Sequence, residues 1–368
     1  MEATETSLNN LSYNEIVFPR LGIDIHLNST AFTIFGIDVQ WYGLIITLGL
    51  LLAMIYAFTQ MKQYGIDPDR AIDAIIGGIV GGVVGARLYY VLLEWDHYAG
   101  DWKSIFNLRQ GGLAIYGGLI GSVLVGCLVA KLRKVPILPL LDICSIGFLL
   151  GQGIGRWGNF FNQEAFGKNT DSLFGMSGGR IQNWISDQNG YLNTNFYLHF
   201  GEELSPDRPV HPCFLYESIW CLVGFVLLAL FARKIRRYDG QIFLLYIGWY
   251  GLERAFVEGL RADSLVVGNV RISQMLAILC VVASVILQIV IGLRVKRMGV
   301  DYRLYKDTAE SKALLAEYDQ QHDKSAAKSA EADTPADDTA DSEETPAEEA
   351  PAPESESAET ETEEEKES

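Results

Sequence analysis

Seven long, mostly apolar stretches constrain the fold of this chain more than any other feature. They are residues 41–61, 71–93, 113–130, 136–155, 212–232, 241–257 and 272–293. A helix needs about 20 such residues to cross the hydrocarbon core of a bilayer. We therefore predict an all-α polytopic membrane protein with seven transmembrane helices, in a membrane domain of residues 41–294.

Basic residues are concentrated in alternate loops between these stretches. The basic set is Lys62, Arg70, Lys131, Arg133, Lys134, Arg233, Lys234, Arg236, Arg237, Arg294, Lys296 and Arg297. Such loops stay on the cytoplasmic side of a membrane. The pattern predicts an N-terminus outside the cell membrane and a C-terminus in the cytoplasm. The first residues lack the basic-then-apolar pattern of a cleavable signal peptide.

Four segments lie outside the predicted spans. We expect residues 1–40 and a small head of residues 156–211 to be extracytoplasmic, and residues 295–324 to form a basic, amphipathic cytoplasmic segment. Residues 325–368 are predicted to be a disordered acidic tail. Residues 307–368 hold 22 of the 46 acidic residues but only 4 of the 29 basic ones. The net charge of −17 therefore belongs to the tail, and the body suggests no nucleic-acid partner.

The cysteines and histidines give no metal-binding pattern. The cysteines are Cys127, Cys144, Cys213, Cys221 and Cys280, none of them in a CxxC pair. We interpret them as small apolar core residues. The sequence predicts no metal and no cofactor.

The second apolar stretch carries a stripe of small residues. Gly77, Gly81 and Gly85 recur every four residues on one helical face. Such stripes most often allow close helix packing, but a groove for a lipid chain or headgroup is the alternative. Arg87 lies just beyond the stripe, where it either snorkels to the interface or binds phosphate.

The most specific local pattern is residues 155–167, at the expected outer end of the fourth stretch. It interleaves Arg156, Asn159, Asn162 and Glu164 with aromatic residues. An arginine offers a planar fork that matches phosphate oxygens. The pattern predicts a site for an anionic headgroup. An aromatic interfacial turn with a snorkelling arginine is the alternative.

A second polar pattern lies on the sixth stretch. Its members, which share one helical face, are Tyr250, Arg254, Glu258 and Arg261. Charges on a membrane helix are costly unless they face a polar cavity or one another. A purely structural pair between Arg254 and Glu258 remains open.

These motifs together resemble those of the prolipoprotein diacylglyceryl transferase family. The long matches are Gly-Arg-x-Gly-Asn-Phe-x-Asn-x-Glu from Gly155, His-Pro-x-x-x-Tyr-Glu from His211, and Tyr-x-x-x-Arg-x-x-x-Glu-x-x-Arg from Tyr250. Shorter matches are Trp41-Tyr42-Gly43, Gly85-Ala86-Arg87-Leu88 and Gly117-Gly118. The resemblance covers residues 40–294, and its first motif is highly specific.

The resemblance implies a bacterial membrane enzyme of lipoprotein maturation. Members of the family move the diacylglyceryl group of phosphatidylglycerol to the lipobox cysteine in the signal peptide of a preprolipoprotein. A thioether forms and glycerol phosphate leaves. This displacement needs a thiolate nucleophile and positive charge for the departing phosphate. The implied partners are phosphatidylglycerol, the signal peptide and the lipid bilayer.

The resemblance also implies roles for individual residues. Arg156 and Arg254 are expected to bind the donor phosphate, in a pocket that Asn159 and Glu164 help to shape. The further expected substrate contacts are Tyr42, Arg87, Gly117, Gly118, Asn162, Gly167, His211, Glu217, Tyr250, Glu258 and Arg261. Among these, the tyrosines would bind the glycerol headgroup, and Glu258 and Arg261 would orient Arg254 and gate lateral exit.

The chain departs from the family at Tyr116, where many members have a histidine before the two glycines. A phenol is a weaker base than an imidazole at neutral pH. We therefore expect Tyr116 to position substrate by hydrogen bonding rather than to act as the general base. A simple interfacial tyrosine is the other possibility.

Two other function classes remain open at this point. One is a membrane lipid or anion transporter with an arginine-lined path. The other is a non-enzymatic assembly factor that binds secreted chains. The sequence has no inverted repeat and no pair of broken helices, which disfavours the transporter.

Overall fold

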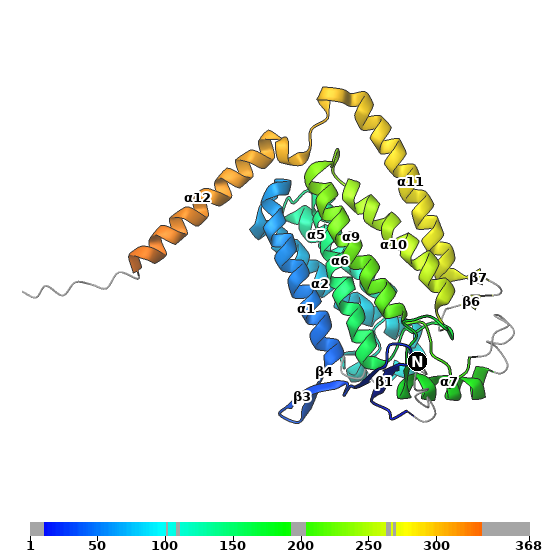
Figure 1. Cartoon of the computed structure of the whole chain (residues 1–368). Coiled ribbons are helices and arrows are strands. Elements are labelled where there is room, and N and C mark those ends of the chain that lie inside the picture. The colour runs from blue at the N-terminus through cyan, green and yellow to red at the C-terminus, as the bar shows by residue number, and fades with distance from the viewer. Residues whose placement is uncertain are drawn as a thin grey trace, which may run out of the picture. The chain divides into compact units, whose positions relative to one another are not determined.

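The computed structural model describes residues 11–100, 102–107, 111–192, 204–262, 266–267 and 270–332. The chain divides into two compact units, Met1–Gln320 and Gln321–Ser368. The long helices of the first unit (Figure 1) are α1 (Trp41–Met61), α2 (Pro68–Leu93), α5 (Ile115–Leu132), α6 (Ile137–Asn162), α9 (Cys213–Lys234), α10 (Gln241–Leu260) and α11 (Ile272–Met298). Shorter helices are α3 (Trp95–Tyr98), α4 (Trp102–Ile105), α7 (Gly179–Leu192), η1 (Lys62–Tyr64), η3 (Gly299–Asp301) and η4 (Tyr305–Asp307).

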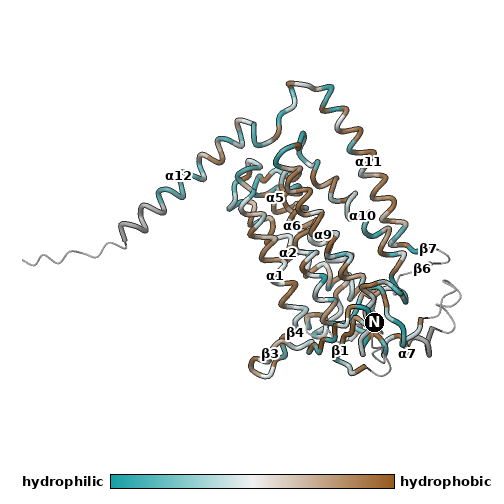
Figure 2. Tube along the Cα trace, viewed as in Figure 1, coloured by the Kyte–Doolittle hydropathy of each residue, from teal (hydrophilic) through white to brown (hydrophobic). Residues whose placement is uncertain are grey.

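Six helices of the described residues are long and apolar enough to cross a membrane. They are α1, α2, α5, α6, α9 and α11. Figure 2 shows the apolar colouring that runs along these helices. Their outward side chains include many exposed leucines, isoleucines and valines. Such faces are stable only against an apolar surrounding, so the protein is a polytopic membrane protein.

The predicted helix at residues 241–257 forms α10, but α10 is not among these six. It carries Glu253, Arg254 and Glu258 within 20 residues. Helix α10 packs against α6, α9 and α11 and turns two of these charges, Glu253 and Glu258, into the interior, where each is at most 2% exposed.

Helices α2 and α5 approach each other closely through their glycines. A Cβ on Gly81 would lie 2.6 Å from the carbonyl oxygen of Gly121, and one on Gly85 would lie 2.4 Å from that of Gly117. No side chain fits at these distances. The stripe on the second stretch therefore serves helix packing, and the alternative of a lipid groove along it is wrong where α5 fills the space.

A buried carboxylate links the starts of α6 and α10. Both Asp142 oxygens accept backbone hydrogen bonds at the start of α10, from Gly240 N and Phe243 N at 2.9 Å each. Gly240 has a φ of +89°, which favours glycine. Asp142 thus satisfies amide groups that have no partner within their own helix. This charge within the fourth stretch is therefore a helix cap.

The N-terminal part is not helical, which corrects the all-α expectation. Strand β1 (Glu15–Phe18) pairs with β2 (Ile23–His26) and with β5 (Ser177–Gly178), whereas β3 (Thr30–Ile34) and β4 (Ile37–Gln40) form a hairpin. Two further short strands, β6 (Val266–Val267) and β7 (Val270–Arg271), pair with each other. Buried Ile16 and Phe18 pack with Phe160 and Phe214, so the strands join the end of the bundle where α6 ends and α9 begins.

Several helices extend beyond their expected ends, and two of these extensions change an expectation. Helix α6 continues past Gly155 to Asn162, so Arg156 lies on a helix rather than in a loop. Helix α12 (Ala309–Ala332) covers the first residues of the segment expected to be disordered. The rest of that segment, residues 333–368, lies outside the described residues.

Candidate functional site

The site is built around one buried carboxylate shared by two arginines. Glu217, in the second turn of α9, is fully buried. Its Oε2 lies 3.0 Å from Arg156 Nη1 on α6, and its Oε1 lies 3.2 Å from Arg254 Nη1 on α10. Three helices therefore contribute one residue each, and a single carboxylate holds the two guanidinium groups side by side.

Arg254 has a second carboxylate partner on its own helix. Its Nη2 donates to Glu258 Oε2, one turn further along α10. Glu258 is 2% exposed. The guanidinium of Arg254 thus contacts two carboxylates, of which only Glu258 lies on the face predicted for the sixth stretch. Tyr250, one turn earlier, stacks on Tyr246 with ring centroids 6.1 Å apart.

Arg156 keeps more of its positive charge available than Arg254 does. Among the described residues its only ion-pair partner is Glu217, which it shares, and its side chain is 21% exposed. Desolvated charge pairs interact more strongly than solvated ones. Because Arg254 pairs with two carboxylates and Arg156 with only one, which it shares, Arg156 is the better placed of the two to attract a further anion.

A hydrogen-bond chain fixes the helix that carries Arg156. Trp157 Nε1 donates to Ser218 Oγ at 3.2 Å, and Ser218 Oγ donates to the carbonyl oxygen of Gly153 at 2.7 Å. Ser218 follows Glu217 directly. The same contact between α6 and α9 therefore sets the positions of Arg156 and its carboxylate together.

Glu164, which was expected to help shape the phosphate pocket, pairs with two asparagines and not with Arg156. Its Oε1 accepts hydrogen bonds from Asn159 Nδ2 at 2.9 Å and from Asn162 Nδ2 at 3.3 Å. These three residues form their own polar group at the end of α6. Tyr42 lies nearby, since a Cβ on Gly158 would be 2.8 Å from its ring.

Gly167, His211 and Arg261 meet through the backbone. Gly167 N donates to the carbonyl oxygen of His211 at 2.8 Å, and Gly167 forms a bridge with Arg261. A Cβ at Gly167 would lie 2.7 Å from His211 Cβ, so only glycine fits there. His211 Nδ1 lies 3.2 Å from Tyr216 Oη, and burial lowers the pKa of His211, which favours the neutral ring at pH 7.

Arg87 is a structural clamp in this structure. It is 5% exposed and donates to four backbone carbonyl oxygens, those of Ser104, Ile105, Gly111 and Gly112, over 2.6–3.0 Å. Its donors are directed to the segment between α2 and α5. Neither snorkelling nor phosphate binding describes it.

Tyr116 lies apart from the arginines. It is in the first turn of α5 with half of its surface exposed. The hydrogen bonds and ion pairs of the described residues connect it with neither arginine. Tyr89 and Gly85 fill the space beside Gly117. Gly117 therefore allows close helix contact and leaves no room for a headgroup. Gly118 has looser surroundings, with its nearest neighbours at 3.5 Å.

Three residues, the buried pair Glu253 and Cys221 together with Gln163, were not recognised as site residues from the sequence. Glu253 is 1% exposed, and the thiol of Cys221 donates to its Oε2 at 3.5 Å. Cys221 is thus a hydrogen-bond donor and not merely an apolar filler. Gln163 joins the site to the strands, because its side chain donates to the carbonyl oxygen of Tyr13 and accepts from Arg180 N. Neither role has a signal in sequence spacing.

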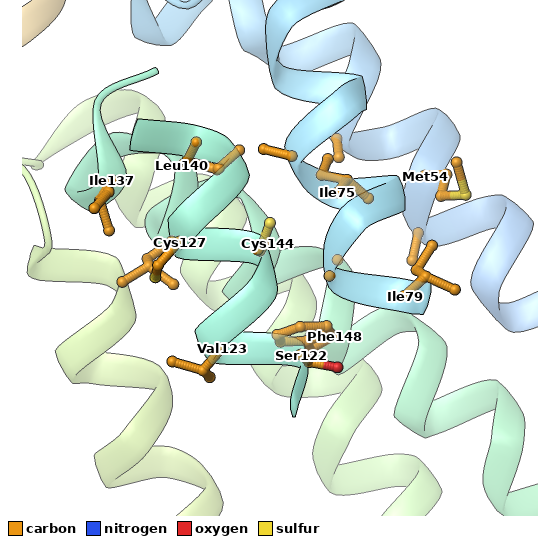
Figure 3. A pocket seen from close by; sticks show the side chains of 18 of the residues that line it. Met54, Ile75, Ile79, Ser122, Val123, Cys127, Ile137, Leu140, Cys144 and Phe148 are labelled. Carbon is orange, nitrogen blue, oxygen red and sulfur yellow. The ribbon is translucent and has the colours of Figure 1, made fainter. Parts of the chain in front are cut away.

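An apolar cavity of about 200 Å³ lies among α1, α2, α5 and α6 (Figure 3). Its lining includes Met54, Ile79, Val123, Cys144 and Phe148. Phe148 precedes Arg156 by eight residues, or about 12 Å along the helix. Along α6, the cavity lining therefore comes to within about 12 Å of Arg156.

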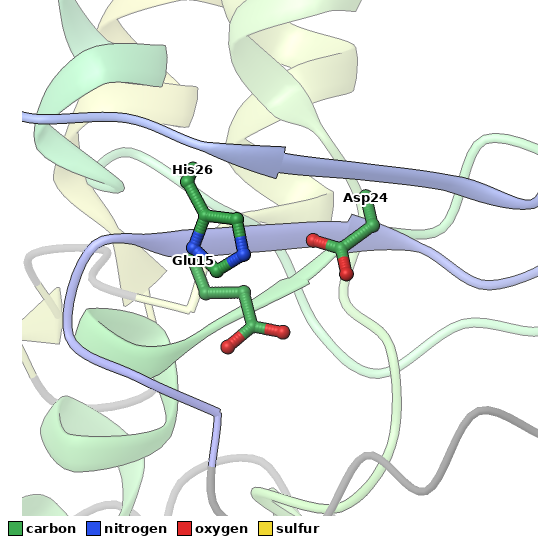
Figure 4. A group of neighbouring side chains, drawn as sticks. All are labelled: Glu15, Asp24 and His26. Atoms are coloured by element: carbon green, nitrogen blue, oxygen red, sulfur yellow. The ribbon is translucent and has the colours of Figure 1, made fainter.

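Figure 4 shows a separate group of potential metal ligands on β1 and β2. Glu15, Asp24 and His26 place one ligand atom each within 4.8 Å of the others. Strand pairing brings them together, since Glu15 lies opposite His26. The group is largely exposed, and exposed acidic residues often gather without binding an ion. It contributes nothing to the arginine site.

The arrangement is suited to holding an anion at the end of a membrane bundle. Fixed arginines beside a desolvated carboxylate cannot rotate away, so their charge is organised before a ligand arrives. An anion that gains negative charge during a reaction would be stabilised most.

Comparison with known proteins agrees with the motifs. Residues 29–290 match a family model described as prolipoprotein diacylglyceryl transferase. A phosphatidylglycerol–prolipoprotein diacylglyceryl transferase of Clostridium novyi (strain NT) is 41% identical over 261 residues, 71% of this chain and 95% of the relative. The protein of that name from Bacillus cereus (strain G9842) is 42% identical over 270 residues, 73% of this chain and 94% of the relative. The one from Bacillus anthracis is also 42% identical over 270 residues.

Proposed function

Because the chain belongs to the prolipoprotein diacylglyceryl transferase family, we infer that it is a membrane transferase that moves the diacylglyceryl group of phosphatidylglycerol to prolipoproteins. The relatives that support this are matched over more than nine-tenths of their own length. The transferase activity belongs to the part of the chain before residue 290.

We further propose that the acceptor is the thiol of a lipobox cysteine in a signal peptide. Its sulfur would displace the phosphate oxygen at the glyceryl carbon of the donor. A C–S bond forms, the C–O bond breaks, and glycerol phosphate leaves with the electron pair. The thiol proton must pass to a base, because the thiolate is the nucleophile.

The observation that carries this proposal is the pair of arginines held by Glu217. Negative charge grows on the phosphate as it departs, and fixed positive groups stabilise that charge more than the ground state. Arg156 is the less neutralised of the two cations, and Arg254 supplies a second cation that is held rigidly. Asn159, Asn162 and Glu164 border the site on the same helix end.

The cavity between α1, α2, α5 and α6 suits an acyl chain of the donor. Its lining is almost entirely apolar, and its start lies about 12 Å from Arg156 along α6. A headgroup at the arginines would leave the acyl chains pointing into the bilayer toward this cavity.

The proposed topology has α10 as a seventh span and the arginine end outside. The charges of α10 then face the bundle interior rather than lipid. Reporter fusions at Lys134 and Arg237 are expected to report cytoplasm, and a fusion near Asn189 to report the outside. A cytoplasmic Asn189 would contradict this topology and put the site on the wrong face.

The tail is expected to be dispensable. The family match ends before it, and the contacts that tie α12 to the bundle, Ser311 Oγ to Gly65 O at 2.8 Å and Lys62 to Asp319 at 2.7 Å, lie before residue 321. Truncation after Gln321 should leave membrane insertion and transferase activity intact. Loss of activity in a stably inserted truncation would show that the tail takes part.

Tyr116 is expected to contribute moderately, by hydrogen bonding to the donor. Its phenol is half exposed and is not committed to a partner within the described residues. Tyr116→Phe should cost about 1–2 kcal/mol of transition-state stabilisation, and Tyr116→His should retain much of the activity. Initial rates on micellar phosphatidylglycerol measure both, with Tyr13→Phe as an equally exposed control.

Two results would contradict this role for Tyr116. An inactive but well-inserted Tyr116→Phe with an altered pH–rate profile would make it the general base. An unchanged rate would make it an interfacial tyrosine only.

Product analysis tests the function as a whole. The purified chain, phosphatidylglycerol and a lipobox peptide should yield a peptide whose mass has increased by one diacylglyceryl group. A peptide in which the cysteine is replaced by serine is the control. An unmodified cysteine peptide, with lipid or anion flux in vesicles, would favour the transporter instead.

A further inference from the structure

A polar pocket of about 320 Å³ lies at the end of the bundle opposite the arginine site. It is lined by Gln60, Gln63, Tyr64, Ala232, Arg233, Arg236 and Lys306. These come from the last turn of α1, from η1, from the end of α9 and the residues just after it, and from η4. The pocket therefore brings three cations together where two apolar helices leave the membrane.

Arg236 forms the buried floor of the pocket. Its side chain is 4% exposed, and its guanidinium stacks on the Tyr64 ring at 3.8 Å from the centroid. Its Nη1 lies 3.6 Å from Asp142 and 3.7 Å from Asp239. These ion pairs fix the arginine in place, and its two carboxylate partners more than balance its single charge.

Of the two carboxylates, Asp142 is occupied at both oxygens, whereas Asp239 is occupied at Oδ2 and has no hydrogen-bond partner at Oδ1 among the described residues. Asp142 accepts the backbone amides at the start of α10, and Asp239 Oδ2 accepts Tyr305 N at 2.8 Å. Neither Arg233 nor Lys306 has a carboxylate within ion-pair distance among the described residues. Two exposed cations at the rim of the pocket are thus left without a counter-charge.

Two buried polar atoms of the lining also lack a hydrogen-bond partner. They are Tyr64 Oη and Arg236 Nη1, which find no hydrogen-bond acceptor among the described residues. A buried donor without a partner costs about 1–3 kcal/mol. An anion in the pocket would accept hydrogen bonds from these donors and would also neutralise the two cations at the rim.

We propose that this pocket is a second anion site, which binds the phosphate of an anionic phospholipid headgroup in the leaflet at that end of the bundle. The cations and buried donors recognise the phosphate, and a basic pocket at helix ends lies at headgroup depth. Ala232 and the neighbouring apolar helix surfaces accommodate the start of the lipid chains. The site is independent of the transfer reaction at Glu217.

The test uses two matched double variants of the full chain. Arg233→Gln with Lys306→Gln removes the rim charges of the pocket. Arg237→Gln with Arg303→Gln removes two exposed charges from the same segments without touching the lining. Thermal unfolding in detergent micelles is followed by tryptophan fluorescence, with added phosphatidate, with phosphatidylcholine, or with inorganic phosphate alone. Phosphatidate lacks the glycerol headgroup of phosphatidylglycerol. Any phosphatidate that binds at the arginine site does so in all variants, because none of them changes that site.

Phosphatidate is expected to raise the unfolding temperature of the wild type and of the Arg237/Arg303 control by about 3 °C relative to phosphatidylcholine. The Arg233/Lys306 variant should lose at least half of this shift. Native mass spectrometry should show one retained phosphatidate fewer. Unchanged transferase activity and an unchanged unfolding temperature in phosphatidylcholine would verify that the Arg233/Lys306 variant is correctly folded. If that variant does not fold, Lys306→Gln alone, on an exposed residue, serves instead.

An equal shift in all three proteins would overturn the proposal, and so would an equal loss in both double variants, which would reveal only general surface charge. A shift produced by inorganic phosphate alone and lost in the Arg233/Lys306 variant would establish a phosphate site but refute the lipid as its source.

Discussion

Replacement of Arg156 by alanine is expected to lower kcat/KM for phosphatidylglycerol by about 10²–10³-fold, which corresponds to about 3–4 kcal/mol of transition-state stabilisation. Arg156 shares its only ion-pair partner among the described residues, Glu217, with Arg254. Its charge is therefore the least neutralised at the site. Its loss also leaves the fully buried Glu217 with a single cation, which is costly for a desolvated carboxylate.

The control is Arg208→Ala, which removes an exposed arginine paired with Asp171 at 3.4 Å. It should keep wild-type activity, because surface ion pairs contribute little. Rates at several donor concentrations separate kcat from KM. An Arg156→Ala enzyme with normal kcat and a raised KM would show that Arg156 binds the ground state and the transition state equally, contrary to the role given to it.

Arg254→Lys is expected to cost about 2–3 kcal/mol although the charge is conserved. The guanidinium reaches Glu217 with Nη1 and Glu258 with Nη2. An ammonium is a single point of charge on a flexible stem and cannot span both carboxylates in the same fixed geometry. The substitution should therefore misplace the cation relative to the departing phosphate.

Arg208→Lys is the matched control and should be silent. Near-wild-type turnover of Arg254→Lys would mean that positive potential alone matters at this position. Glu258→Gln offers an independent comparison, since it releases one arm of the fork and keeps the arginine. Its rate should fall less than that of Arg254→Lys, because Glu217 still holds Nη1.

Much of the fold follows from apolar length alone. The stretch at residues 41–61 coincides with α1, because polar residues bound it at both ends. At α6 the expected end at Gly155 is seven residues too early. Hydrophobicity reports where a helix leaves lipid, whereas backbone hydrogen bonding decides where it stops, and Arg156 and Asn159 continue the helix into the polar region.

The arginine pair was predictable as a pair of phosphate-binding candidates, but the partners were not. Gln163 ends α6 with a φ of +54°, and this reversal turns Glu164 back to Asn159 and Asn162. A left-handed non-glycine residue has no reliable sequence signal. Arg87 was misjudged for a related reason, since its partners are backbone carbonyls, which every residue possesses and no motif reveals.

The glycine contact between α2 and α5 has a mechanical consequence. With Gly81 and Gly85 against Gly121 and Gly117, these helices cannot slide past each other without backbone collision, and the carbonyl clamp of Arg87 ties the segment between them. The two helices are therefore expected to move together as one rigid unit. Any widening of the apolar cavity that they share with α1 and α6 would therefore tilt the two helices together.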